Sequence, residues 1–221
     1  LTAAAGRLLS FPNHNARPHL ASQLIFVVFV YTMIDDRITI RKRCIVFTVC
    51  SFLLAWFHGG MIPLLFVVFL VFIVIEALYG NFRICGYYLL GMLTGFISSL
   101  LSPIGIGTWT YAWLQSKGAE VWANNIEWQP KTFTIPEITI ILLILAGFAA
   151  DERFRKFDKK VITRFCFYCM FIILSCKYCR FMNFTALVIV MLCAEEIQIL
   201  LCWLNDHITR IDTKIFDFSD V

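Results

Sequence analysis

Four polar segments, separated from one another by long apolar stretches, carry the side chains best suited to chemistry. These side chains are Arg17 and His19, then His58, then Glu127 with Trp128, and finally Arg180. Guanidinium groups bind phosphate, and a carboxylate or an imidazole transfers protons, so this combination suits an anionic substrate carried on a lipid. We therefore predict catalytic roles for Glu127 and His58 and substrate-binding roles for the other four residues.

Each of these residues also has a purely structural interpretation. Glu127 would then be an ordinary loop acid, and His58 a helix-end residue hydrogen-bonded to a neighbour. Arg17 and Arg180 would be anchors at a membrane interface. The two glycines that follow His58 do not form a phosphate-binding loop, because no Gly-Lys-Ser/Thr sequence comes after them.

Three further acids, Glu76, Glu195 and Glu196, lie in apolar sequence, where ionisable groups are costly and often functional. We expect Glu76 at the cytoplasmic end of a span, within reach of Arg83. Glu195 and Glu196 would mark an ion or proton path if the last span continues past them. If that span ends near Cys193, they instead begin an amphipathic helix on the cytoplasmic surface, which is the interpretation we favour.

Four of the nine cysteines form two CxxC pairs, Cys166 with Cys169 and Cys176 with Cys179. A zinc ribbon needs roughly 15–20 residues between its pairs so that the chain can fold back around the metal. Here six residues separate the pairs, and the whole segment is predicted as one helix, in which cysteines three residues apart share a face. We interpret them as small packing residues and predict no metal site.

The composition indicates the class of protein. Of 221 residues, 60% are hydrophobic and 15% are charged, against roughly 45–50% apolar and ~25% charged in ordinary soluble domains. The mean hydropathy is +0.78. These values exclude a soluble domain, a disordered chain and a coiled coil, and they predict an all-α, polytopic transmembrane helical bundle in a cell (plasma or inner) membrane.

Charged clusters, glycines and prolines divide the bundle into about seven spans. The 32 uncharged residues from Cys44 to Ile75 would form a helix of roughly 48 Å. This exceeds the ~30 Å hydrocarbon core, so they must form two spans that break near His58 and Pro63. The predicted spans are 20–34, 44–57, 61–79, 86–101, 137–150, 161–176 and 181–203. They form one transmembrane domain over residues 1–203, with an aromatic-rich outer loop at 102–136 and a cytoplasmic tail at 204–221.

The positive charges predict the orientation of these spans. Thirteen of the 19 Lys and Arg residues fall in loops on one side, which the positive-inside rule makes cytoplasmic. The predicted functional residues then share the outer face.

Three short motifs resemble a bacterial group of the GT-C glycosyltransferase superfamily, whose members carry W-x-N-x-H-G-G, N-P-Y-G and E-W-x-S-P in this order. The matching residues are Trp56, His58, Gly59 and Gly60, then Pro103 and Gly105, then Glu127, Trp128 and Pro130. The departures are Phe57, Ser102, Ile104 and Gln129. The resemblance covers roughly Arg17 to Arg180.

This resemblance implies hexosyl or pentosyl transfer from a polyprenyl-phosphate donor on the outer face, with a divalent cation left open as cofactor. Partners would be the lipid-linked sugar and membrane lipids, not nucleic acid. Such enzymes carry a catalytic Asp or Glu in the first outer loop. The sequence has no Asp between Leu1 and Leu20, so we expect this acid upstream of Leu1 and the chain to be an inactive fragment. The rival interpretations are a secondary transporter or flippase, and a noncatalytic membrane scaffold.

Overall fold

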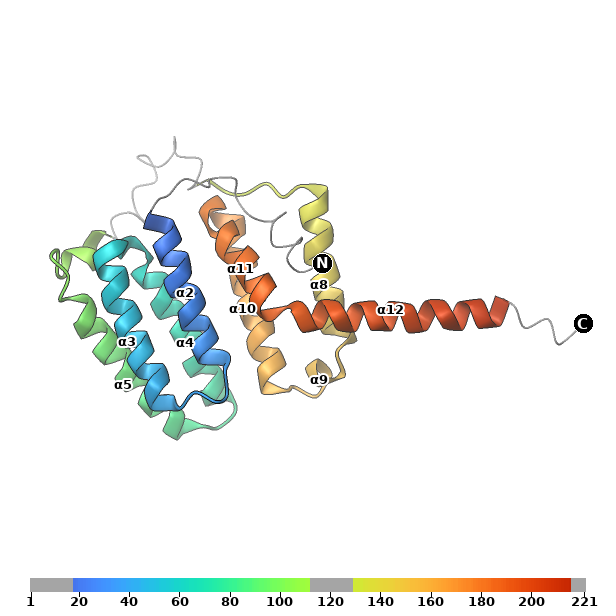
Figure 1. Ribbon diagram of the computed structural model, residues 1–221, viewed down its shortest axis with the longest axis horizontal. Helices are drawn as coiled ribbons and strands as arrows, with labels where there is room; N and C mark the ends of the chain where they lie inside the picture. Colours follow the sequence, from blue (N-terminus) through green and yellow to red (C-terminus); the bar gives the residue numbers. More distant parts are fainter. Residues whose placement is uncertain (1–17, 112–128, 216–221) are drawn as a thin grey trace, which may run out of the picture. The chain divides into compact units, whose positions relative to one another are not determined.

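The computed structural model describes residues 18–111 and 129–215, with side chains from 20 to 111 and from 129 to 207. Every regular element in these ranges is helical (Figure 1), which confirms the predicted all-α class. The described residues fall into two compact units. The N-terminal unit contains residues 18–111, 129 and 177–180, and the C-terminal unit contains 130–176 and 181–215.

The N-terminal unit contains four long helices joined by short connections. They are α2 (Pro18–Ile34), α3 (Ile40–Phe57), α4 (Ile62–Leu78) and α5 (Phe82–Ser99), with a turn of 3-10 helix, η1 (Gly59–Met61), between α3 and α4. These bounds lie within a few residues of the first four predicted spans. Pro63 stands in the first turn of α4, where its missing N–H costs nothing. The break after α3 therefore falls at the predicted glycine and proline signals.

A seam of small residues brings α5 against α3. A Cβ on Gly95 would lie 2.8 Å from Cδ1 of Phe47, and one on Gly91 would lie 3.1 Å from Sγ of Cys44. Ser98, one turn beyond Gly95, donates a hydrogen bond to the Thr48 carbonyl at 3.0 Å. Gly91 and Gly95 form a GxxxG pair, the spacing that lets membrane helices approach closely.

The centre of this unit is aromatic. The Phe47 ring stacks on Phe69 with centroids 4.0 Å apart, and it meets Phe29 and Phe66 at 5.7 and 5.0 Å. Phe29, Phe47 and Phe69 are fully buried. Because these rings come from α2, α3 and α4, their contacts hold three helices around one core.

The C-terminal unit contains α8 (Ile135–Ala150), α9 (Glu152–Arg155), α10 (Lys159–Lys177), α11 (Met182–Leu192) and α12 (Ala194–Ile215). The turn η3 (Cys179–Phe181) precedes α11. Lys131 and Thr134 hold the start of α8. The Thr134 N–H and hydroxyl both donate to Oε2 of Glu137, and Lys131 Nζ lies 3.0 Å from its Oε1. This TxxE capping box is a helix-start signal.

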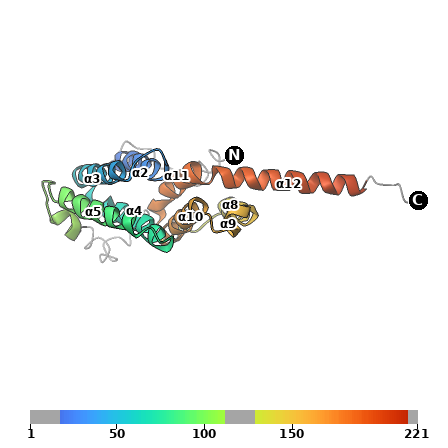
Figure 2. The same ribbon diagram turned by 90° about the horizontal axis from the view of Figure 1, so that it is seen from below.

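The segment predicted as a continuous span over 181–203 is instead two helices. The chain bends by 62° between α11 and α12, with Cys193 at the break. Figures 1 and 2 show α12 crossing α8 and continuing beyond the other helices of its unit. The break at Cys193 is the alternative favoured from the sequence. Its physical cause is the set of ion pairs, described below, that fixes the first turn of α12.

Among the described helices, one is long and apolar enough by itself to cross a membrane. The helix Gly59–Leu78 meets this criterion, with 20 residues and a mean hydropathy of 2.9. The bent pair α11 and α12 would give a second span if the two helices cross together. Two further helices are apolar but shorter, Leu20–Ile34 and Ile135–Ala150. The seven-span arrangement therefore stays a prediction.

Candidate functional site

His58 lies where the chain leaves α3 and turns into α4. Its backbone is extended, its N–H donates to the Leu54 carbonyl at 2.8 Å, and its own carbonyl accepts from the Met61 N–H at 2.9 Å. The second bond encloses Gly59 and Gly60 in a single tight turn, and the first closes the last turn of α3. The His-Gly-Gly sequence thus ends one helix and starts the next within four residues.

A hydroxyl from α2 orients the His58 ring. The Ser22 Oγ lies 2.8 Å from Nδ1 of His58, and Ser22 is 2% exposed. The hydrogen bond agrees with the structural interpretation of a helix-end histidine bonded to a neighbour. It also fixes the ring orientation, as the catalytic role requires.

Arg180 lies next to the same turn. Its Nη2 approaches Sδ of Met61 at 3.6 Å, and Met61 ends the turn that His58 begins. The neighbouring Cys179 N–H donates to the Gln129 carbonyl at 2.9 Å. The structure therefore brings two of the predicted site residues, His58 and Arg180, to one end of the N-terminal unit.

The segment after α5 packs on this turn. A Cβ on Gly59 would lie 2.5 Å from the Thr108 methyl, so only glycine fits there without displacing Thr108. The Thr108 hydroxyl lies 3.0 Å from the Ser102 hydroxyl, and the Trp109 indole N–H donates to Ser99 Oγ at 2.9 Å. Two of the three motifs, HGG and SPIGIG, are thus neighbours. The sequence could not reveal this contact, because it joins residues 49 positions apart.

The other predicted site residues are not placed. Arg17, Glu127 and Trp128 lie outside the described residues, as does the His19 side chain, although its backbone belongs to the first turn of α2. Their predicted roles stay predictions.

Glu76 stabilises a turn at the other end of α4. It is 5% exposed, its Oε2 accepts from Asn81 Nδ2 at 2.8 Å, and its carbonyl accepts from the Asn81 N–H at 2.8 Å. These two bonds join the end of α4 to the start of α5.

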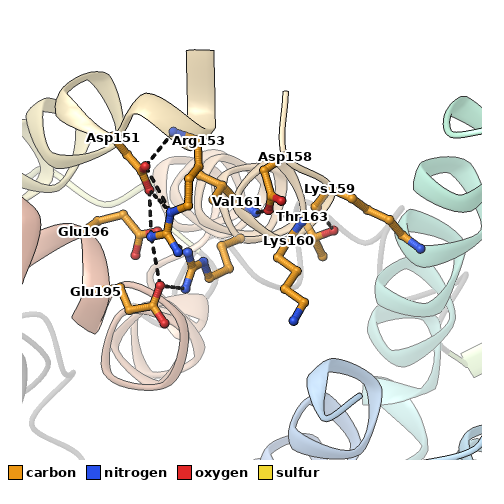
Figure 3. A network of polar contacts seen from close by, with 10 residues as sticks. Asp151, Arg153, Asp158, Lys159, Lys160, Val161, Thr163, Glu195 and Glu196 are labelled. Carbon is orange, nitrogen blue, oxygen red and sulfur yellow. Dashed lines mark hydrogen bonds and ion pairs between the residues drawn. The ribbon is translucent and has the colours of Figure 1, made fainter. Parts of the chain in front are cut away.

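The C-terminal unit holds a second polar cluster, which we call the ion-pair network (Figure 3). It consists of Asp151 and Arg153 at α9, Arg164 on α10, and Glu195 and Glu196 in the first turn of α12. Arg153 Nη2 lies 2.9 Å from Asp151 Oδ2 and 3.0 Å from Glu195 Oε2. Arg164 contacts Glu195 through Nη1 at 2.8 Å and Glu196 through Nη2 at 3.0 Å. Three helices are therefore joined by charge at the bend.

Electrostatics differ among the three acids of this network. Burial raises the pKa of Asp151, but the hydrogen bonds from Arg153 outweigh that effect and leave the pKa below its ordinary value. The hydrogen bond with Arg164 lowers the pKa of Glu195. Glu196 is fully buried, and burial raises its pKa despite the opposing charge of Arg164. Glu196 is therefore the member of the network with the greatest tendency to take up a proton.

An open groove of about 610 Å³ adjoins the network. Most of its lining comes from one side of α12, and Ala150 and Arg153 complete it. The α12 residues are Glu195, Gln198, Ile199, Cys202, Trp203 and Asp206. Glu195 and Glu196 stand out in the sequence as acids within apolar residues, whereas their partners Arg153 and Arg164 are visible there only as cytoplasmic charge. Within the described part of the chain, no three His, Cys, Asp or Glu side chains are grouped to hold a metal ion.

Comparisons with known proteins add no relative. No protein-family model, curated protein or solved structure matches the chain. The functional conclusions below therefore rest on the residues and their geometry.

Proposed function

We propose that the chain belongs to a polytopic, GT-C-like membrane glycosyltransferase that takes a sugar from a polyprenyl-phosphate donor on the outer face. The observation that carries the proposal is that Arg180 contacts Met61, which ends the turn begun by His58, while Ser22 orients the His58 ring. A guanidinium and an oriented imidazole at the same turn suit a reaction in which a phosphate leaves and a hydroxyl attacks.

The chemistry follows from these two side chains. The acceptor hydroxyl attacks the anomeric carbon of the donor sugar, and the bond from that carbon to the phosphate oxygen breaks. His58 assists proton removal from the hydroxyl, and Arg180 binds the phosphate whose charge increases as it leaves. Glu127 stays a proposed partner in proton transfer.

Helix packing supports the membrane location. The α3–α5 seam has the GxxxG spacing typical of membrane helices, and Leu89, Leu90, Leu93 and Ile97 on α5 are each more than half exposed. Four large aliphatic side chains exposed on one helix are expected to face lipid rather than water. We place α2, α3, α4, α5, α8, α10 and α11 across the membrane.

We place α12 along the cytoplasmic surface. α11 has 11 residues and is roughly 16 Å long, short of the ~30 Å core, so its crossing requires the preceding turn η3 and a locally thinned bilayer. α12 is rich in charge in its first turn and half exposes Leu201 and Trp203, as expected for a helix at an interface.

Donor binding tests this proposal. We would reconstitute the full chain in lipid nanodiscs and titrate it with decaprenyl phosphate. Arg180→Ala should weaken binding about tenfold or more, because it removes a charge-assisted phosphate contact of roughly 1.5–3 kcal/mol. Lys177→Ala is the matched control, since Lys177 is an exposed cation three residues away. Equal affinity in wild type and Arg180→Ala would exclude the phosphate role.

One observation favours a second candidate, a secondary transporter. The chain breaks at Cys193, directly before the buried Glu196, and broken helices beside acids are common at ion sites. Proton flux into liposomes that Glu196→Gln abolishes would favour this candidate. Absence of flux in the wild type would reject it.

A further inference from the structure

We propose that the connection between α9 and α10 is a docking surface for anionic phospholipid headgroups, with Phe157 inserted among the lipids. The surface consists of Arg155, Lys156, Phe157 and Lys160, all exposed. The inference rests on the proposed membrane location and adds a lipid class that the proposed reaction does not require.

Phe157 has a backbone conformation that phenylalanine rarely adopts. Its φ is +54°, which makes it the one non-glycine residue with positive φ in the described ranges. A bulky side chain in this left-handed region is strained, and such strain persists where the surrounding structure enforces it, often at functional positions. The ring is 72% exposed, so most of its surface is accessible to a partner outside the protein.

Hydrogen bonds on both sides hold Phe157 in this conformation. Its N–H donates to the Phe154 carbonyl at 3.1 Å, and the next N–H, of Asp158, donates to the Arg153 carbonyl at 2.9 Å. Asp158 then caps α10 by accepting from the Lys160 and Val161 N–H groups at 3.0 and 3.2 Å. Since Arg153 is itself held in the ion-pair network, the loop presents Phe157 on a fixed base.

The charge around the ring is positive because the segment 151–160 carries five Lys and Arg residues against three acids. Asp151 is paired with Arg153, and Asp158 is occupied at the start of α10. Glu152 has a loose contact of 3.7 Å with Lys156, and both side chains are more than three-quarters exposed. Such an exposed pair contributes little and leaves the lysine available. Figure 3 shows Lys159 and Lys160 directed away from the ion-pair network.

An anionic lipid surface is the occupant that fits both features. Exposed lysines complement negatively charged headgroups, and an exposed aromatic ring prefers the boundary between headgroups and hydrocarbon. A second copy of the same surface would be repelled by its like charge. A free phosphate ion would use the lysines but leave Phe157 without a role.

The proposal is tested by titrating the detergent-solubilised full chain with dioctanoyl phosphatidylglycerol and, separately, with dioctanoyl phosphatidylcholine. The wild type should prefer phosphatidylglycerol. Lys156→Gln or Lys160→Gln should each reduce that preference by about fivefold, the typical effect of one lysine near an anionic surface. Lys177→Gln, outside the surface, should leave it unchanged.

The Phe157→Gly variant separates a role of Phe157 in lipid binding from a role in the stability of the fold. Glycine accepts positive φ, so this variant should unfold at a higher temperature than the wild type while binding both lipids more weakly. Unchanged lipid preference in Lys156→Gln and Lys160→Gln would overturn the proposal. So would competition by millimolar inorganic phosphate, which would indicate a free-anion site.

Alkaline extraction of membranes containing the chain keeps this test distinct from the proposed function. Release of the chain by carbonate would reject the transmembrane location, whereas the lipid titration would still report on the loop. Conversely, loss of decaprenyl phosphate binding in Arg180→Ala concerns only the transferase.

Discussion

Gly147 of α8 lies directly against the backbone of Glu196 in α12. A Cβ on Gly147 would meet the Glu196 carbonyl oxygen and would lie 2.8 Å from its carbonyl carbon. Because backbone atoms cannot rotate away as a side chain can, the crossing of these two helices depends on this glycine. The same crossing positions Glu195 and Glu196 for their arginine partners.

Replacing Gly147 with Ala should therefore destabilise the C-terminal unit by about 1–3 kcal/mol, as overpacking of a close contact does. Gly86→Ala is the control, because a Cβ there meets nothing within 4 Å and alanine should gain ~0.5–1 kcal/mol in a helix. Thermal unfolding of both variants in the same detergent provides the comparison. Equal melting temperatures would contradict the contact.

Gly95→Ala should likewise loosen the contact between α3 and α5. The new methyl would overlap the Phe47 ring, which cannot shift freely because it stacks on Phe69. We expect a loss of about 1–3 kcal/mol, measured by chemical unfolding of the reconstituted chain. Gly86→Ala, on the same helix, serves again as control, and a Gly95→Ala variant at least as stable as that control would show that the seam is not tightly packed.

Local signals in the sequence explain why the helices were predictable and why their contacts were not. Charges, glycines and prolines mark the ends of α3 and α4, so the bounds followed from length and composition. The Gly91–Gly95 spacing was visible in the sequence and marks α5 as a helix suited to close packing, but it does not identify α3 as the partner.

Other features depend on tertiary structure. Ser22 and His58 are 36 positions apart, and Arg164 and Glu195 are 31 apart, so only the arrangement of the helices brings them together. The bend at Cys193 has no proline or glycine to signal it. It was suggested from the sequence only because two adjacent acids are costly inside a membrane.

Replacing Arg164 with Gln should be strongly destabilising near neutral pH, by about 3–5 kcal/mol, because it leaves the buried Glu196 without its counter-charge. Glu196 has a pKa above its ordinary value in the folded protein, so the folded state binds a proton more tightly than the unfolded state. Stability of the variant should therefore increase as the pH falls from 8 towards the ordinary glutamate value of 4.5.

Melting temperatures at pH 8 and pH 5.5 measure this effect. The variant should recover part of its stability at the lower pH, whereas Lys156→Gln, an exposed control, should match the wild type at both values. If the Arg164→Gln variant has the same melting temperature at pH 8 and pH 5.5, Glu196 does not titrate in this range.

The Ser22–His58 pair allows the two interpretations of His58 to be separated. If the histidine serves only as a helix-end residue, Ser22→Ala and His58→Ala should each cost about 0.5–1.5 kcal/mol, the usual contribution of one hydrogen bond. A double-mutant cycle should then give a coupling of the same size.

A catalytic role for His58 adds a second effect. In the complete enzyme, His58→Ala should reduce sugar transfer by about 10²–10⁴-fold, as loss of a proton-transfer group does. Ser22→Ala should reduce transfer far less, because the imidazole stays in place. Unfolding and transfer measured on the same preparations distinguish the cases, and equal small losses of transfer in both variants would leave His58 only its structural role.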